Sequence, residues 1–264
     1  MNLSNRKIEF LKIPKYFVTL FLIIIPLFRQ FKNPLFVLMS YLREISPDYV
    51  CLKNNNKFFL SNNADIITVV AIFCKYEYGK IEPNSTIIDI GANIGVFSLY
   101  CAIHGAKKVY SFEPSEESFE FLNKNIVENG FEKIIVPFKL AVHDKKTFVN
   151  FPSQSNPSNK ISDDGQKVET TTLDSICEDI DTVDLLKIDC EGSEHIFIPS
   201  TSAETFSKIK EIRMEYHEKI PIIETFTMTK HKPTDSYKGL VHFSHLNRNS
   251  LLNRILSKIK SFFY

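Results

Sequence analysis

Short apolar runs alternate with longer segments that have one apolar face in the middle of the chain. Residues 86–90 are rich in β-branched residues and barely alternate between polar and apolar positions, which favours a strand buried on both faces of a parallel sheet. Residues 94–104 carry apolar side chains at helical spacing. The order recurs, so we predict an α/β fold with a doubly wound, mostly parallel sheet and helices on both faces. The further predicted elements are strands at 107–113, 133–139, 183–189 and 209–218 and a helix at 115–129.

The segments on either side of this core have different patterns. Residues 48–60 predict a β-hairpin around an Asn-rich turn, and residues 64–78 predict a helix. Residues 238–246 form one clear strand pattern, whereas residues 221–237 are interrupted by proline and leave the edge of the sheet open. We divide the chain into residues 1–80, with apolar helices, the hairpin and a cap helix, residues 81–245, the α/β domain, and residues 246–264, a basic amphipathic helix.

The apolar stretch Tyr16–Phe28 has three interpretations. It is shorter than the roughly 20 residues that a membrane-spanning helix needs, and Arg29 and Lys32 follow it directly. Pro26 predicts a kink or a break. The stretch therefore fits a helix packed on the domain or a helix lying on a membrane surface better than a true span.

The charge is unevenly distributed although the whole chain carries a net charge of only +1. Residues 1–32 hold six basic side chains and one acidic side chain, and residues 246–264 hold four basic side chains and no acid. The remainder is acidic, which disfavours a nucleic-acid partner. Basic, apolar chain ends instead suit an anionic membrane surface. The five cysteines form no C-x-x-C pair, which indicates reduced thiols in the cytoplasm and no zinc site.

The turn after the first core strand reads DIGANIG, residues 89–95. Gly91 and Gly95 lie between a strand and a helix N-terminus, where glycine permits a positive φ and the close approach of a ligand. The turn lacks the third glycine of a dinucleotide-binding motif and the lysine of a phosphate loop. Asp89 would repel a pyrophosphate and suits a ligand with a positive group, such as an amino-acid ammonium. By itself, the turn also fits a tight connection that binds nothing.

Glu113 ends the second core strand and is followed by Pro114. An acidic residue about 20 residues beyond such glycines holds ribose hydroxyls in nucleotide-binding α/β folds. Together with Asp89, Glu113 favours a nucleoside that bears an amino acid, a description that S-adenosylmethionine fits. The alternative is a solvated glutamate in a loop.

The sequence KIDCEGSE at the end of the fourth core strand places Lys187, Asp189 and Glu191 on alternate positions. A polar floor that positions a substrate hydroxyl and a structural ion cluster both fit this pattern. A hydroxyl that is methylated loses a proton, and Asp189, Glu191 and His217 are the candidate bases, with histidine suited to neutral pH. Asp189, Glu191 and Glu215 are the oxygen ligands that Mg²⁺ prefers, but their spacing does not require a metal.

Three blocks of the sequence resemble the FkbM-type methyltransferases, which use S-adenosylmethionine. They are IIDIGANIGVFSLY, VYSFEPSEESFEFLNKNI and VDLLKIDCEGSEHIF, and the segments LAVHDKK and NPLFVLMSYL are also similar to the family. The resemblance implies a Rossmann-like methyltransferase fold. Together with the residue patterns, it implies cofactor-binding residues Asp89, Gly91, Asn93, Gly95, Glu113, Ala141 and Asp189, and catalytic residues Asp189, Glu191 and His217.

We therefore expect an S-adenosylmethionine-dependent methyltransferase that modifies a hydroxyl of a sugar, glycan or lipid-linked acceptor. The expected location is the cytoplasm, with peripheral contact to the inner face of the membrane. A nicotinamide-dependent oxidoreductase and a non-catalytic, membrane-associated scaffold are the alternatives. The acceptor itself and the oligomeric state are not predicted, because acceptor pockets are built from variable loops.

Overall fold

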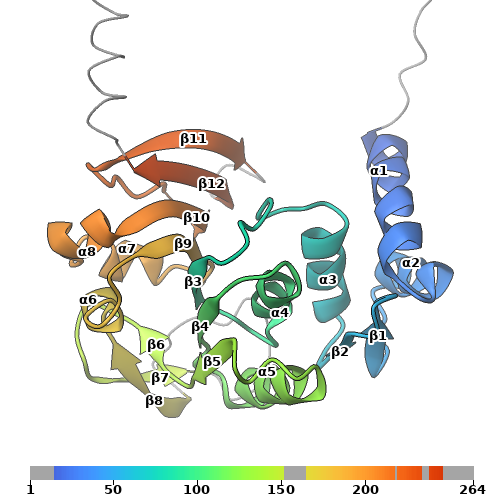
Figure 1. The fold of residues 1–264 in the computed structure, drawn as a ribbon, viewed down its shortest axis with the longest axis horizontal. Coiled ribbons are helices and arrows are strands. Elements are labelled where there is room, and N and C mark those ends of the chain that lie inside the picture. The colour runs from blue at the N-terminus through green and yellow to red at the C-terminus, as the bar shows by residue number, and fades with distance from the viewer. Residues whose placement is uncertain (1–14, 152–164, 218, 234–237, 246–264) are drawn as a thin grey trace, which may run out of the picture.

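The structure is a computed structural model that describes residues 15–151, 165–217, 219–233 and 238–245. A sheet with the strand order β11-β12-β10-β9-β3-β4-β5 lies at its centre (Figure 1). The five strands from β10 to β5 run parallel, and β12 runs antiparallel to β10. This arrangement confirms the predicted α/β fold with a mostly parallel sheet. The strands are β3 (Thr86–Ile90), β4 (Lys108–Phe112), β5 (Ile135–Phe138), β9 (Val183–Ile188), β10 (Ile209–His217), β11 (Phe226–Pro233) and β12 (Lys238–His245).

Helices cover both faces of the sheet because its strands are apolar on both sides. Ile87 of β3 belongs to the buried cluster on the side of the first group of helices, whereas the next residue, Ile88, belongs to the cluster on the opposite side. The first group is α3 (Asp65–Phe73), α4 (Val96–Ile103) and α5 (Glu116–Glu128), and the second is α6 (Leu173–Ile176), α7 (Glu194–Phe197) and α8 (Ala203–Lys208). A small second sheet contains β6 (Ala141–Val142), β7 (Phe148–Phe151) and β8 (Gln166–Thr171).

The edge of the central sheet, which the sequence left open, is a strand pair. β11 pairs with β12 in antiparallel register and lies outermost in the sheet. Most of its residues are exposed, so it lacks the apolar pattern that marks the inner strands. The predicted strand at 238–246 corresponds to β12, whose middle residues are buried.

The N-terminal elements pack on the face of the sheet that α3, α4 and α5 cover. They are α1 (Lys15–Gln30), α2 (Pro34–Arg43) and the antiparallel hairpin of β1 (Tyr49–Cys51) and β2 (Lys57–Phe59), which confirms the predicted hairpin. Ile23 and Leu27 of α1 are buried in the same cluster as α3 and α4. Pro26 lies inside α1 and does not break it, so of the expected kink or break only the break is excluded.

No helix within the described ranges is long and apolar enough to cross a membrane. The predicted amphipathic helix at 246–264 lies outside the described residues. The division into three parts remains a prediction, and the described residues 15–80 share a buried core with the α/β domain.

Candidate active site

A cleft of about 920 Å³, open solvent included, lies at the carboxyl ends of β3, β4 and β9. Ligands of open α/β sheets bind at this edge. The cleft brings together most of the residues that the sequence singled out, although they come from four separate segments. Its lining includes Gly91, Asn93, Glu113, Ala141, Asp189 and Glu191. Asp89, Gly95 and His217 are not part of the lining and lie behind it.

Gly91 and Gly95 shape the turn between β3 and α4. Gly91 has a φ of +74°, and a Cβ atom there would lie 1.8 Å from the carbonyl oxygen of Asp189. At Gly95, with a φ of +86°, a Cβ atom would lie 2.5 Å from the side chain of Leu122. Only glycine at position 91 therefore lets the turn pass this close to the end of β9, whereas at Gly95 the positive φ is the main reason for glycine, because the end of a leucine side chain can move.

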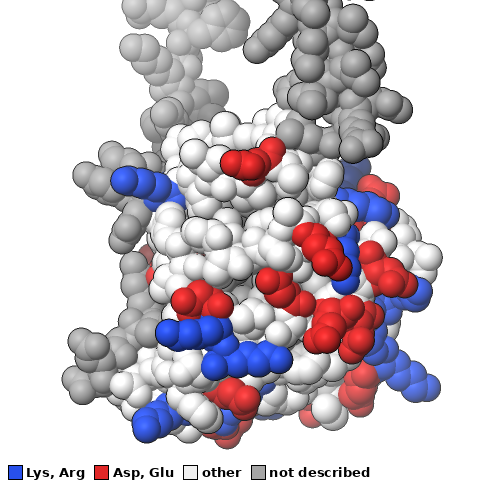
Figure 2. Space-filling view, turned by 90° about the vertical axis from the view of Figure 1, so that its left-hand side faces the viewer, with Lys and Arg blue, Asp and Glu red and all other residues white. Residues whose placement is uncertain are grey.

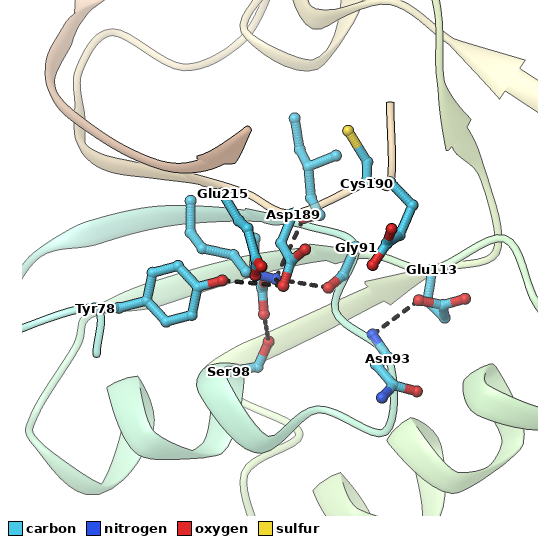
Figure 3. A network of polar contacts seen from close by, with 12 residues as sticks. Tyr78, Gly91, Asn93, Ser98, Glu113, Asp189, Cys190 and Glu215 are labelled. Atoms are coloured by element: carbon cyan, nitrogen blue, oxygen red, sulfur yellow. Dashed lines mark hydrogen bonds and ion pairs between the residues drawn. The ribbon is translucent and has the colours of Figure 1, made fainter. Parts of the chain in front are cut away.

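Glu113 holds the turn from the neighbouring strand end. Its Oε2 accepts a hydrogen bond from the backbone N–H of Asn93 at 2.8 Å (Figure 3). Its Oε1 accepts one from the backbone N–H of Ser115 at 2.8 Å. Burial raises the pKa of Glu113 to about 7, although these two donors counteract the shift. Each carboxylate oxygen retains a second lone pair, so the group can also accept hydrogen bonds from hydroxyls in the cleft.

The position of Asp89 differs from the sequence-based expectation that its side chain faces a ligand. Its carboxylate is fully buried, pairs with the Nζ of Lys187 at 3.0 Å and accepts a hydrogen bond from Ser98 of α4 at 2.6 Å. Lys187 also donates to the carbonyl oxygen of Gly91 at 2.6 Å. Burial alone would lower the pKa of Lys187, but the charges of Asp89 and Asp189 outweigh it and raise the pKa. The buried pair thus supports the turn from beneath.

Asp189 stands at the cleft, directly after β9. Its Oδ2 accepts a hydrogen bond from the hydroxyl of Tyr78 at 2.9 Å and lies 3.9 Å from the Nζ of Lys187. Tyr78 lies in the connection between α3 and β3, and its pKa is raised well above the ordinary value by burial and by nearby carboxylates. The hydroxyl of Tyr78 therefore stays protonated and acts as a donor. No motif marks Tyr78 in the sequence, so only the fold reveals its place.

His217 lies between two glutamates at the end of β10. Its Nε2 is 3.1 Å from Oε2 of Glu191, and its Nδ1 is 3.2 Å from Oε1 of Glu194. Burial would lower the pKa of His217, but both carboxylates outweigh it and raise the pKa to about 9. The imidazole is therefore protonated near neutral pH and does not suit the role of a base there. Glu194, which the sequence analysis did not single out, is fully buried.

Asp189, Glu191 and His217 place one ligand atom each within 4.8 Å of one another, which is close enough to share a metal ion. Glu215, the third Mg²⁺ ligand considered from the sequence, is not in this group. Its carboxylate pairs with the Nζ of Lys238 on β12 at 2.9 Å, and Lys238 lies 3.4 Å from Glu191. Burial and the charge of Asp189 raise the pKa of Glu215 to about 7. Lys238 was also missed, because strand pairing brings it to the site.

The comparison with known proteins agrees with this geometry. The profile of the Methyltransferase FkbM domain matches residues 89–246, which is more than half of the chain. The 31-O-demethyl-FK506 methyltransferase FkbM of Streptomyces tacrolimicus is 24% identical over 185 residues, which cover 55% of this chain and 70% of that protein. The AMB antimetabolite synthetase AmbE of Pseudomonas aeruginosa is 23% identical over 185 residues, 53% of this chain but only 9% of that much longer protein.

Among solved structures, a putative methyltransferase, YhhF from Escherichia coli, aligns with a TM-score of 0.45 and 9% identity over 72% of this chain and 92% of that one. The family match rests on the sequence profile and includes the segments from Asp89 to Glu113 and from Asp189 to His217. The match supports a methyltransferase and gives no support to a nicotinamide-dependent oxidoreductase or a scaffold. This chain therefore belongs to the family of methyltransferases that carry the FkbM domain.

Proposed function

We propose that this methyltransferase transfers the methyl group of S-adenosylmethionine to a hydroxyl oxygen of a small-molecule, sugar, glycan or lipid-linked acceptor. The observation that carries the proposal is the position of Glu113, whose carboxylate lines the same cleft as the glycine turn and Asp189. A carboxylate at this position can accept hydrogen bonds from both hydroxyls of a ribose.

The residues of the cleft fit this cofactor in shape, polarity and charge. Gly91 and Asn93 of the glycine turn line the cleft, so backbone without a bulky side chain borders the space for a ligand. Glu113 also lines the cleft and keeps unused acceptor capacity, while Ala141, Phe112 and Leu140 line it with apolar surface suited to a purine ring. The acidic edge at Asp189 complements a positively charged amino group or sulfonium. Asn93 positions Glu113 through its backbone N–H.

The cofactor supplies an electrophilic methyl carbon on sulfur, and the chain's residues align the acceptor with it. As the new carbon–oxygen bond forms, the carbon–sulfur bond breaks, and the hydroxyl releases its proton. We propose that Asp189 and Glu191 orient the hydroxyl and that a carboxylate of this group receives the proton. His217 lies behind Glu191 at 3.1 Å and acts as a positioning residue that fixes the Glu191 side chain.

The acceptor class is supported by indirect observations. The name of the Streptomyces relative describes methylation of an O-demethyl compound, that is, at oxygen. The hydroxyl donor of Tyr78 and the carboxylates beside it suit a polyhydroxylated molecule, which both donates and accepts hydrogen bonds. An acidic rim disfavours nucleic-acid phosphates.

We also propose that α1 and α2 dock on an anionic membrane surface. Ile23 and Leu27 are buried, yet the opposite side of α1 and the outer side of α2 expose large apolar side chains, and both helices lie at one end of the molecule (Figure 1). The opposite side, near α6 and α8, carries acidic and basic groups interspersed (Figure 2). The basic side chains Arg29, Lys32 and Arg43 are exposed on or between α1 and α2 and suit acidic lipid heads. The exposed apolar side chains are Leu22, Ile25, Phe28, Leu35, Phe36, Met39 and Leu42.

A methyl-transfer assay tests the proposed reaction. The full chain is incubated with S-adenosylmethionine that carries an isotopically labelled methyl group and with a glycan and lipid extract. Mass spectrometry should detect S-adenosylhomocysteine and labelled acceptors. The methyl group of these acceptors should be attached to oxygen and should resist mild base. Label found only on nitrogen or carbon would overturn the hydroxyl assignment.

A further inference from the structure

A group of three side chains beside the cleft has the geometry of a metal site. We propose that Asp189, Glu191 and His217 bind a divalent first-row transition-metal ion that holds the acceptor oxygen. The inference rests on the proposed function, because it assigns the ion to the acceptor half of the same site. The three ligand atoms lie within 4.8 Å of one another.

The orientation of His217 is fixed by Glu194. Oε1 of Glu194 accepts a hydrogen bond from the backbone N–H of His217 at 2.8 Å and lies 3.2 Å from the Nδ1 of the same histidine. Glu194 is itself held by the backbone N–H of Gly192, which donates to Oε2 at 2.8 Å. Once a metal ion displaces the Nε2 proton, a histidine that donates its Nδ1–H to a fixed carboxylate presents the lone pair of Nε2, which is the arrangement found behind metal-ligating histidines.

The Nε2 atom of His217 lies at the distance from Glu191 that two ligands of one metal ion would have. It is buried and faces a carboxylate of the same group. It points toward Oε2 of Glu191, 3.1 Å away. Two ligand atoms that each lie about 2.1 Å from an octahedral ion are about 3 Å apart, so this spacing suits two ligands of one metal.

Both carboxylates keep an oxygen available for the ion. The contacts of Asp189 with Tyr78 and Lys187 use Oδ2 and leave Oδ1. Lys238 contacts Oε1 of Glu191 and leaves Oε2 on the side of His217. In each carboxylate, protein contacts hold one oxygen in place, and the other oxygen remains available to the ion.

The local charge also favours a cation. Two lysines, Lys187 and Lys238, stand among a larger number of carboxylates, so the cluster has an excess of negative charge. A proton on His217 offsets part of it, and a divalent ion that replaces this proton would offset more. The carboxylates in the cluster are Asp89, Asp189, Glu191, Glu194 and Glu215.

The donor set selects the class of ion. Mg²⁺ prefers oxygen ligands, whereas an imidazole nitrogen with two carboxylates suits Mn²⁺, Fe²⁺ or Zn²⁺. We therefore use Mn²⁺ as the probe. The full chain, freed of metal with EDTA, is titrated with Mn²⁺ and with Mg²⁺ by calorimetry, and bound Mn²⁺ is examined by pulsed electron paramagnetic resonance.

We expect saturable binding of one Mn²⁺ per chain, with an affinity at least about tenfold higher than for Mg²⁺, and a nitrogen coupling in the spectrum. Glu194→Gln should weaken Mn²⁺ binding about 10- to 100-fold, and His217→Gln should remove the nitrogen coupling. Asp184→Asn, at the opposite end of β9, is the control and should bind Mn²⁺ as the parent does. Circular dichroism verifies that each variant is folded.

Absence of saturable Mn²⁺ binding, or an unchanged nitrogen coupling in folded His217→Gln, would overturn the metal site. S-adenosylmethionine binding is measured on the same samples without metal. If the cofactor binds and Mn²⁺ does not, the metal inference alone fails. If the cofactor does not bind, the proposed function fails independently.

Discussion

At the scale of single residues, the protonation of Glu113 links cofactor affinity to pH. Burial raises the pKa of Glu113 to about 7 in the free protein, and hydroxyl donors of a bound ribose would stabilise the ionised form. Cofactor binding therefore releases a proton, and the affinity for S-adenosylmethionine should rise about tenfold between pH 6 and pH 8. Isothermal titration calorimetry across this range measures the change, and Glu113→Gln should flatten the profile.

The same group should make the free protein less stable as the pH rises. Its folded-state pKa lies above the ordinary value of 4.5, so the stability contribution is complete below that value and is lost as the pH rises through about 7. Saturating cofactor should reverse this loss in thermal unfolding. A pH profile of affinity that is equally steep in Glu113→Gln would assign the titration to another group.

The carboxylate of Asp189 is the residue on which turnover should depend most. Asp189→Asn can still accept the hydrogen bond of Tyr78 but removes the charge that faces Lys187 and the cleft, so we expect a folded protein with turnover reduced roughly 100-fold or more. Asp184→Asn makes the same chemical change on the same strand, away from the cleft, and should keep nearly full turnover. Equal turnover in both variants would show that Asp189 plays no part in the reaction.

At the scale of elements, the turn between β3 and α4 depends on close contact with the end of β9. A Cβ atom at Gly91 would collide with the carbonyl oxygen of Asp189, and the left-handed backbone adds strain. Gly91→Ala should therefore destabilise the fold by about 1–2 kcal/mol from backbone strain and a further 1–3 kcal/mol from overpacking, and weaken cofactor binding.

Gly130→Ala is the matched control, because Gly130 has a φ of +69° but no atom within 4 Å of the added Cβ. It should show only the strain contribution in chemical unfolding. Equal losses of stability in the two variants would mean that the close approach at Gly91 is not important.

Local patterns predicted the inner elements of the fold well. β3 and β4 are buried strands, and the glycine turn and Glu113 follow them directly, so both appear in the sequence. β11 was not predicted because an exposed edge strand has no apolar signature. Tyr78 and Lys238 reach the site only through the packing of distant segments. Likewise, only the fold brings Glu191 and Glu194 to His217, where their carboxylates raise the pKa of the imidazole. Such features require the tertiary structure.

At the scale of the whole molecule, the exposed apolar sides of α1 and α2 predict association with anionic vesicles. Flotation with phosphatidylserine-containing liposomes should recover the full chain at low salt and less of it at high salt, because each basic side chain near the surface contributes about 1 kcal/mol. The double variant Leu35→Glu, Phe36→Glu should remain with the soluble fraction.

Val127→Glu on α5 replaces an equally exposed apolar side chain away from these helices and should float like the parent. If the parent does not float, or if the double variant floats equally well, the apolar sides of α1 and α2 do not contact lipid. A dimer in solution that is lost in the double variant would assign them to a contact between two copies of the chain.

The central claim is that the cleft binds S-adenosylmethionine through Glu113. A calorimetric measurement of binding affinity tests this claim most directly. We predict saturable binding of S-adenosylmethionine and no binding of NAD⁺. Glu113→Ala should lose about 1.5–3 kcal/mol of binding free energy, whereas Glu116→Ala, an exposed neighbour outside the cleft, should lose almost none. Binding of NAD⁺ in place of S-adenosylmethionine, or an unchanged affinity in Glu113→Ala, would contradict the account.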